Sequence, residues 1–451
     1  MAKWALILAI ILPLFLASCD RAAAEAEDID FARYFANRDL FIGETLTISM
    51  YQNSLYGRVT ETIAWHYMRE NPGVYIEVVL HATRAGFIDT VTTQLLAGAA
   101  DTLIMADAMS FVPGAGAFAH FRPMDWQSPR ISHLFADFFP IIEAVPDFDE
   151  ADWYMAGLNA MAIDGRLIAF PKQFVYSYFT ANRNVPGLAE AFGQHQSISL
   201  ETLLDLHGRF APEGMLLYPA FNPTHAMPLI FNNHFDSENQ MVDFYNQTFI
   251  DLLNDLRALT SPPDASDGIY GRLNRDSAFS HRYLFDFRDL GTEWRNLPLA
   301  EDELIFINPI PEIDCEGNLL LTPFLSFALN AGATPAQQAL AFDFIQFMLR
   351  PESLERFGAG IFSYKPIHRH SFRYHTWRNI PSEDRDQLTE TATARQNQLA
   401  QIPATMRYRA PIAIQTILAE VLGQFTDGLI DARQTAELLQ NRISIVLMEM
   451  D

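Results

Sequence analysis

Cysteines and basic residues are both scarce in this chain of 451 residues. It has two cysteines, and its 31 lysine and arginine residues are outnumbered by 55 aspartate and glutamate residues. The formal net charge of −24 repels nucleic acid and anionic lipid headgroups. The charge balance therefore argues against nucleic acid as a partner, and it gives no support to an acidic substrate.

The apolar run at the N-terminus is too short to cross a bilayer as a helix. Lys3 precedes the uncharged segment 4–15, and its 12 residues fall short of the roughly 20 that a spanning helix needs. A positive charge followed by a short apolar run is typical of a signal peptide. We therefore expect an exported protein without an N-terminal transmembrane anchor.

The four residues that follow this run resemble the bacterial lipobox. They read Leu-Ala-Ser-Cys and end at Cys19; in the lipobox the cysteine is lipidated and becomes the mature N-terminus. The resemblance implies that residues 1–18 are removed and that lipid on Cys19 anchors the exported protein. The expected location is the outer face of the bacterial cytoplasmic membrane, or the periplasm. An ordinary signal peptide with an incidental cysteine is the alternative. Cys315 then lacks an intrachain disulfide partner, and we interpret it as a bystander thiol.

Strand and helix patterns alternate after residues 19–43, an acidic and alanine-rich segment that we interpret as a tether. Helical spacing of apolar residues, ended by Asn71-Pro72-Gly73 and by Gly98, separates three expected strands. These strands cover residues 46–50, 75–80 and 101–105. The order predicts βαβ units and a parallel sheet.

The rest of the chain also mixes strands and helices. Thr334 and Pro335 are expected to start a helix, because threonine caps helices and proline is tolerated at the first helical position. Arg350-Pro351 ends that helix. The other expected elements are a strand pair over residues 164–181, helices over most of residues 199–257, strands at 304–311 and 324–329, and helices over the last 45 residues.

Several segments match a known family in their order and spacing. The strand and helix between Leu46 and Gly73 match an opening unit, and Asp101–Asp107 matches a third strand that ends at a cleft. Asp164–Pro171 matches a segment that crosses between lobes, and Ser326–Leu349 matches a late strand and helix. With the lipobox, this pattern resembles the extracellular solute-binding lipoproteins of ABC importers, of the sugar-binding, family 1 type. The resemblance covers roughly residues 44–451.

The resemblance implies an α/β, two-lobed periplasmic-binding-protein type II fold with discontinuous lobes and an interlobe cleft. Residues 44–160 and 326–362 are expected to form lobe 1, and residues 161–325 and 363–451 lobe 2. The chain is expected to cross between the lobes near residues 158–164, 320–328 and 358–366.

The implied function is that of the substrate-binding component of an ABC importer, not of an enzyme. A monomer would capture a sugar or oligosaccharide between its lobes and deliver it to the transmembrane subunits of a permease. Two alternatives stay open, an exported carbohydrate-active enzyme and a ligand sensor for a membrane receptor. A peptide or another polar solute is the alternative ligand.

Ligands of open parallel sheets bind beyond the carboxyl ends of the strands. Gln52 and Asn53 follow the first expected strand, Asp107 follows the third, and Tyr176 follows the crossing strand. Amides and carboxylates bind sugar hydroxyls, and aromatic rings stack on the apolar faces of sugars. The alternatives are a turn for Gln52 and Asn53, a helix N-cap for Asp107 and lobe core for Tyr176.

Four further residues complete the predicted ligand site. Trp126 lies in a loop and Asn222 precedes a proline. Arg407 and Tyr408 precede a long helix, near the position where the resemblance implies a contact in the cleft. Core packing is the alternative for Trp126, and a turn is the alternative for Asn222.

No cofactor, metal ion or catalytic residue is expected. His368, His370 and His375 lie close in sequence, but they lack a neighbouring carboxylate or a recognisable ligand spacing. The chain has no Gly-x-Ser-x-Gly, P-loop or Gly-x-Gly-x-x-Gly motif. A glycosidase needs two carboxylates that face each other across a cleft, a pairing that the sequence alone leaves open.

Overall fold

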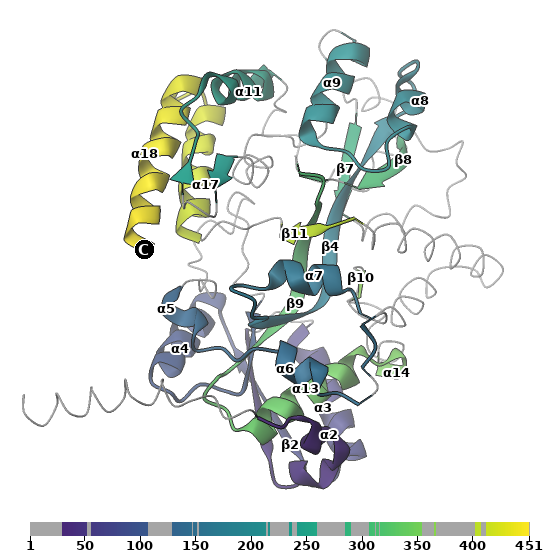
Figure 1. Ribbon diagram of the computed structural model, residues 1–451, viewed down its shortest axis with the longest axis vertical. Helices are drawn as coiled ribbons and strands as arrows, with labels where there is room; N and C mark the ends of the chain where they lie inside the picture. Colours follow the sequence, from purple (N-terminus) through teal and green to yellow (C-terminus); the bar gives the residue numbers. More distant parts are fainter. Residues whose placement is uncertain are drawn as a thin grey trace, which may run out of the picture.

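The protein forms two lobes joined by long strands, as the computed structural model shows (Figure 1). Among the described residues the largest sheet has nine strands, in the order β10-β4-β9-β3-β1-β2, with β11 on β9 and with β7 and β8 on β4. The α/β class predicted from the sequence is confirmed. The described residues are 29–51, 56–106, 129–146, 148–150, 153–212, 215–216, 234–236, 241–258, 285–289, 306–311, 313–314, 316–353, 365–366, 402–406 and 412–450.

The first lobe contains the βαβ units expected from the sequence. Three parallel strands, with β1 between the other two, are connected in turn by two helices. The prediction of these five elements is confirmed. They are β1 (Thr45–Tyr51), α3 (Tyr56–Glu70), β2 (Tyr75–His81), α4 (Arg84–Leu96) and β3 (Leu103–Met105).

Alternating apolar residues and capping residues explain these elements. Leu46, Ile48 and Met50 are buried on one face of β1, because side chains alternate along a strand. The Thr83 hydroxyl accepts a hydrogen bond from the backbone N–H of Gly86 and caps the start of α4. Gly98 follows α4 with φ of 67°, a conformation that glycine adopts at low cost.

Helix α13 (Pro335–Leu349) lies inside the first hydrophobic core and is buried on nearly all sides. A helix that is apolar all round is expected in such a position. The predicted cap at its start is confirmed as a capping box. The Thr334 side chain accepts from the backbone N–H of Gln337, and the Gln337 side chain accepts from that of Thr334.

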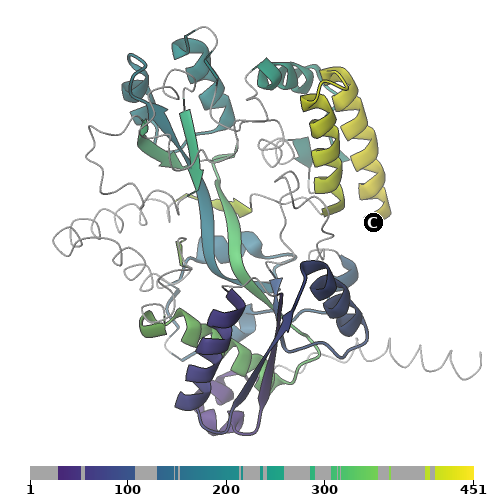
Figure 2. The same cartoon turned by 180° about the vertical axis from the view of Figure 1, so that it is seen from behind.

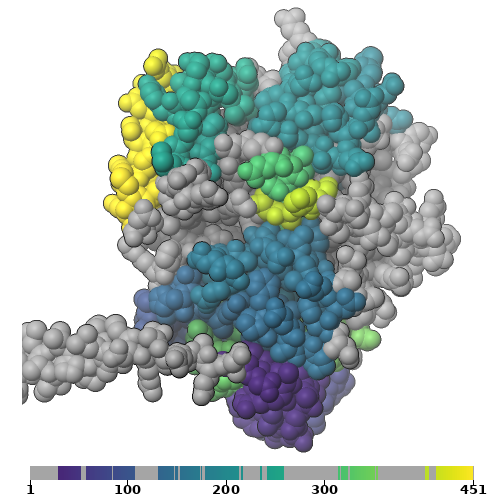
Figure 3. All heavy atoms as spheres, in the orientation of Figure 1, coloured from purple at the N-terminus to yellow at the C-terminus, as the bar shows by residue number. Residues whose placement is uncertain are grey.

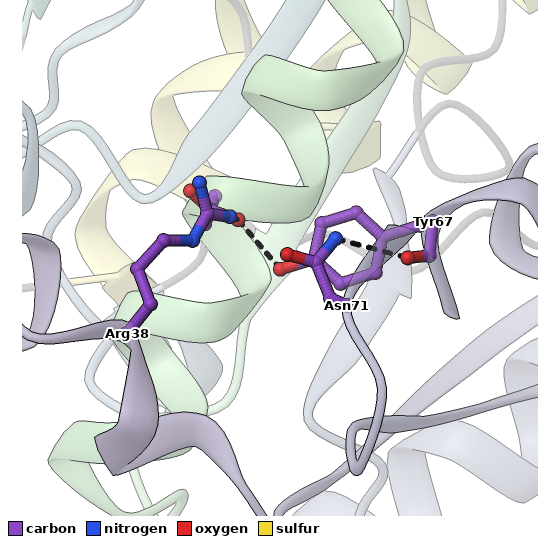
Figure 4. A network of polar contacts seen from close by, with 4 residues as sticks. Arg38, Tyr67 and Asn71 are labelled. Atoms are coloured by element: carbon purple, nitrogen blue, oxygen red, sulfur yellow. Dashed lines mark hydrogen bonds and ion pairs between the residues drawn. The ribbon is translucent and has the colours of Figure 1, made fainter. Parts of the chain in front are cut away.

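A buried carboxylate ties α13 to α3 and to the N-terminal segment (Figure 4). Asp343 accepts hydrogen bonds from the Tyr67 hydroxyl, at 2.5 Å, and from Arg38. Burial and the neighbouring carboxylate raise the pKa of the Tyr67 hydroxyl above its usual range, so it stays a donor. The Asn71 side chain donates to the backbone carbonyl of Tyr67 at 2.9 Å and secures the end of α3.

The last part of the predicted tether belongs to the first lobe, which corrects the expectation for residues 19–43. Residues 32–41 form α2 (Ala32–Ala36) and the 3₁₀ helix η2 (Arg38–Phe41). Phe31, Tyr34 and Phe41 are buried in the first core. Apolar residues at helical spacing, and the bond from Arg38 to Asp343, hold this segment against α13. Cys19 and residues 1–18 lie outside the described residues.

Two long antiparallel strands cross between the lobes (Figures 1 and 2). β4 (Ala169–Asn182) pairs with β9 (Leu319–Leu329) from Ala169 to Tyr176. From Ser177 onward β4 pairs instead with β7 (Phe285–Asp289) and β8 (Phe306–Pro311). Along β4, Phe174 belongs to the first core and Phe179 to the second, so a single strand links both lobes.

The first predicted crossing, residues 158–164, is wrong. Residues 155–161 form α7 (Met155–Met161), and its Leu158 and Met161 are buried in the first core. A tight turn follows, with positive φ at Asp164 and Gly165. In place of the strand pair expected over residues 164–181, the chain therefore forms this turn and then one long strand, β4. The crossing predicted at 320–328 lies within β9. Of the crossing predicted at residues 358–366, the structure describes only β10 (Lys365–Pro366), which pairs with β4.

The second lobe packs helices against the far part of β4. Its core joins residues of β4 to helices from two separate parts of the chain. The predicted helices around residues 200–206 and 249–256 and at the C-terminus are confirmed. The elements of this lobe are β8 (Phe306–Pro311), α8 (Leu188–Gly193), α9 (Leu200–Phe210), α11 (Gln247–Ala258), α17 (Ile412–Thr426), α18 (Ala432–Met450), β5 (Phe235–Asp236) and β6 (Met241–Val242).

Short elements complete the described part of the chain. β11 lies at the surface between the two lobes in Figure 3, where it is yellow-green. No helix among the described residues has the length and apolar character needed to cross a membrane. The short elements are β11 (Ala404–Met406), α5 (Pro129–Ser132), α6 (Phe139–Glu143) and α14 (Pro351–Ser353).

Candidate functional site

The carboxyl ends of the parallel strands of lobe 1 meet at one edge of the sheet. β1 ends at Tyr51, β2 at His81 and β3 at Met105, and Tyr51 lies opposite His81 in the register. β4 runs in the same direction, because β3 and β4 are both antiparallel to β9. The edge where ligands bind in open α/β sheets is therefore the edge from which β4 leaves for the second lobe.

The strand register brings distant parts of the chain to one level of the crossing. Tyr176 of β4 and Met406 of β11 both lie opposite Leu321 of β9. Nearer lobe 1, Met105 and Phe170 both lie opposite Phe327. Six residues of β4 separate these two levels, or about 20 Å at about 3.3 Å per residue. A ligand that reached from the strand ends of lobe 1 to the crossing would span this length.

Five of the eight predicted ligand residues follow the end of a strand within two residues, three of them after β1 or β3 and two after β11. Gln52 and Asn53 come after Tyr51, Asp107 comes after Ala106, and Arg407 and Tyr408 come after Met406. These five residues lie outside the described residues, as do Trp126 and Asn222. The backbone of Tyr176 lies within β4, at the crossing. A common cavity for these residues stays a prediction.

Sequence reasoning missed a polar group at the same edge, at the end of β2. His81 lies there with its Nε2 atom 3.3 Å from Ser49 Oγ, and Ser49 Oγ donates to Asp101 Oδ2 at 2.5 Å. Ser49 is fully buried, whereas His81 and Asp101 are partly exposed. Ligands bind beyond the carboxyl ends of strands in open α/β sheets. This rule was applied to β1 and β3; applied to β2 as well, it would have selected His81.

These three side chains do not form a catalytic triad. In a serine hydrolase the histidine lies between the serine and the aspartate and removes the serine proton. Here Ser49 lies between His81 and Asp101, and its proton points to the carboxylate. Because Ser49 is also fully buried, its hydroxyl is not placed to attack a substrate.

Close packing supports the strand that crosses between the lobes. Tyr154 and Phe174 meet edge to face, with ring centroids 5.8 Å apart. Gly157 of α7 lies so close that an added Cβ would be 2.5 Å from Phe174 Cε2. Burial raises the pKa of the Tyr154 hydroxyl above the usual range of a phenol, so it remains neutral. The base of β4 is therefore fixed against lobe 1.

No group of three or more metal-binding side chains occurs in the part of the chain that the structure describes. The histidines considered from the sequence, His368, His370 and His375, lie outside that part, as does Cys315.

No protein-family model matches the chain, and no curated protein matches its sequence. Solved structures do match over nearly the whole chain. The sugar-binding protein MalE of Xanthomonas citri has a TM-score of 0.61 at 14% identity, covering 90% of this chain and 98% of its own. A periplasmic oligogalacturonide-binding protein of Yersinia enterocolitica has a TM-score of 0.58 at 14% identity, with coverage of 90% and 100%.

A family 1 extracellular solute-binding protein of Alicyclobacillus acidocaldarius is also similar to this chain. Its TM-score is 0.56 at 13% identity, and the match covers 90% of this chain and 99% of that protein. Identities this low establish the fold and nothing finer. Together with the crossing strands, they confirm the two-lobed fold of periplasmic binding proteins that the sequence resemblance implied.

Proposed function

We propose that this chain is the substrate-binding component of an ABC importer and not an enzyme. The observation that carries the proposal is the shared edge, where three parallel strands end and β4 leaves for the second lobe. Side chains from both lobes can meet a solute there, in the fold that the MalE and oligogalacturonide-binding structures share. The position of Ser49 between His81 and Asp101 gives no support to hydrolase chemistry.

Binding would act by shifting an equilibrium between an open and a closed arrangement of the lobes. A solute that contacts both lobes binds the closed form better and raises its population. We place the hinge between Tyr176 and Ser177, where the pairing of β4 with β9 ends and its pairing with β7 and β8 begins. We keep the lobe ranges predicted from the sequence, with two changes. Residues 31–41 are added to lobe 1, and the first crossing between the lobes is moved to β4.

A sugar or oligosaccharide is the proposed ligand. Structures similar to this chain include one with ribitol, from Agrobacterium radiobacter, and a binding protein for cyclic α-maltosyl-1,6-maltose, from Arthrobacter globiformis. The level of the strand ends and the level of Tyr176 are about 20 Å apart along β4, which suits an oligosaccharide better than a single ring. Gln52, Asn53 and Asp107 would bind hydroxyl groups at the strand ends.

The proposed location is the outer face of the cytoplasmic membrane, where lipid on Cys19 would hold the protein near its permease. Intact mass of protein extracted from membranes should show the acylated form without residues 1–18. A Cys19→Ala variant should appear in the soluble fraction. If that variant stayed membrane-bound to the same extent, the proposed lipid anchor would be wrong, whatever the ligand.

The test of the function is a thermal-shift screen of the mature chain against sugars, polyols and peptides. A ligand that binds only the folded state adds about 2.7 kcal/mol at a concentration 100 times its Kd. We expect one class of sugar to raise the melting temperature in proportion to the logarithm of its concentration. Stabilisation by peptides alone would contradict the sugar assignment, and turnover of a labelled oligosaccharide would contradict the assignment as a binding protein.

A further inference from the structure

The hydrogen bonds around Ser49 determine which nitrogen of His81 carries a proton. The Ser49 hydroxyl has a single proton and donates it to Asp101, because an ionised carboxylate only accepts. Toward His81 the hydroxyl oxygen can then only accept, so His81 Nε2 must be the donor in the 3.3 Å contact. A neutral imidazole has one protonated nitrogen. In the neutral form of His81, Nδ1 is therefore the nitrogen that keeps its lone pair.

His81 lies at the edge of the sheet where the ligand site is proposed. His81 is the last residue of β2 and lies opposite Tyr51, which directly precedes Gln52. Its ring meets Phe87 of α4 edge to face, with centroids 5.4 Å apart. Packing against Phe87 and the bond to Ser49 fix the ring, while part of the side chain stays exposed.

We propose that His81 Nδ1 accepts a hydrogen bond from a hydroxyl group of the bound solute. Ser49 and Asp101 are positioning residues, because they fix the tautomer and do not touch the solute. The inference rests on the proposed function and deepens it. A fixed acceptor selects a solute that presents a donor there, such as a polyol or a sugar hydroxyl. It disfavours a carboxylate or phosphate at the same place, since these groups only accept.

Nitrogen NMR of histidine-labelled protein tests the tautomer and the contact together. We expect His81 to show the Nε2–H tautomer in the free protein, and its Nδ1 resonance to move when maltose or ribitol is added. Ser49→Ala removes the acceptor for Nε2–H and should increase the Nδ1–H population. An Nδ1–H tautomer in the wild type, or an Nδ1 resonance that is not moved by a probe that stabilises the protein, overturns the inference.

Two variants separate a ligand contact from a structural role. Asparagine at position 81 presents its amide near the position of Nδ1, and glutamine near that of Nε2. We expect His81→Asn to keep the affinity for the probe that binds within a few-fold while losing thermal stability. We expect His81→Gln to keep stability and to bind roughly 2- to 12-fold more weakly. The opposite pattern, with affinity kept by glutamine and lost by asparagine, would show that His81 acts only through Ser49.

The two ways of failing are distinguishable. If neither maltose nor ribitol nor any other sugar of the screen stabilises the wild type, the proposed function fails. If the wild type is stabilised by either probe but the Nδ1 resonance of His81 does not move, only the present inference fails.

Discussion

Tyr67 donates a 2.5 Å hydrogen bond to Asp343, a residue 276 positions away in the sequence. This bond joins the first long helix of lobe 1 to the late helix α13. Replacing Tyr67 by Phe keeps the ring contacts with Phe344 and Phe347 but leaves the buried carboxylate with one donor fewer. We expect a loss of about 1–3 kcal/mol in the free energy of unfolding, measured by urea denaturation.

Tyr75→Phe is the matched control for this substitution. Tyr75 lies at the start of β2 and its side chain is 63% exposed, so removal of its hydroxyl should change stability by less than about 0.5 kcal/mol. Equal effects of the two substitutions would contradict the structural role assigned to Asp343.

The contact between α7 and the crossing strand should tolerate no added atom at Gly157. An alanine Cβ there would lie 2.5 Å from Phe174 and 2.7 Å from Tyr154. Gly157→Ala is therefore expected to cost about 1–3 kcal/mol through overpacking. Gly423→Ala is the control, because Gly423 lies within α17 and has open space around its Cβ position. That change should stabilise by about 0.5–1 kcal/mol; destabilisation by both would mean that steric contact at Gly157 is not the cause.

Stability of the second lobe should fall as the medium becomes acidic. Burial against the rings of Phe244 and Phe249 lowers the pKa of His234. A group with a lowered folded-state pKa stabilises the protein above its unfolded value, about 6.5, and this contribution is lost as pH falls through the folded value. Melting temperatures between pH 8 and pH 5 should therefore decline less for His234→Asn than for the wild type. Parallel curves for the two proteins would refute this role of His234.

Ligand affinity should depend on residues from separate segments. Asp107→Ala is expected to weaken sugar binding severalfold, since one lost hydrogen bond costs about 0.5–1.5 kcal/mol. Tyr176→Ala is expected to weaken it comparably through lost stacking. Controls of the same type are Asp205→Ala, on the exposed face of α9, and Tyr75→Ala. Calorimetry should give wild-type affinity for both controls. Unchanged affinity in both test variants would remove Asp107 and Tyr176 from the site.

Local patterns in the sequence predicted the secondary structure of lobe 1 well. Alternation in residues 46–50 and the breaker Gly98 act over a few residues, and their elements appear where they were expected. The predicted first crossing failed because Leu158 and Met161 are equally compatible with a strand or with a short buried helix. Only the long-range pairing of β4 with β9 shows that the chain crosses between the lobes in β4 and not at residues 158–164.

The candidate site was accessible to prediction only in part. The rule of strand ends selects the loops after β1 and β3, but it cannot reveal that Tyr51 and His81 share one level of the register. Nor does the sequence indicate that Ser49 and Asp101, 52 positions apart, bond to each other. Side-chain networks of this kind depend on tertiary contacts, and the spacing of residues along the chain does not predict those contacts.

Small-angle X-ray scattering of the mature protein tests the central claim most directly. The claim is that a solute binds between the lobes and closes them about the hinge in β4. With saturating amounts of a sugar that stabilises the protein, the account predicts a smaller radius of gyration and a shorter maximum dimension. An unchanged scattering curve, in a sample where calorimetry shows the sugar to be bound, would contradict it.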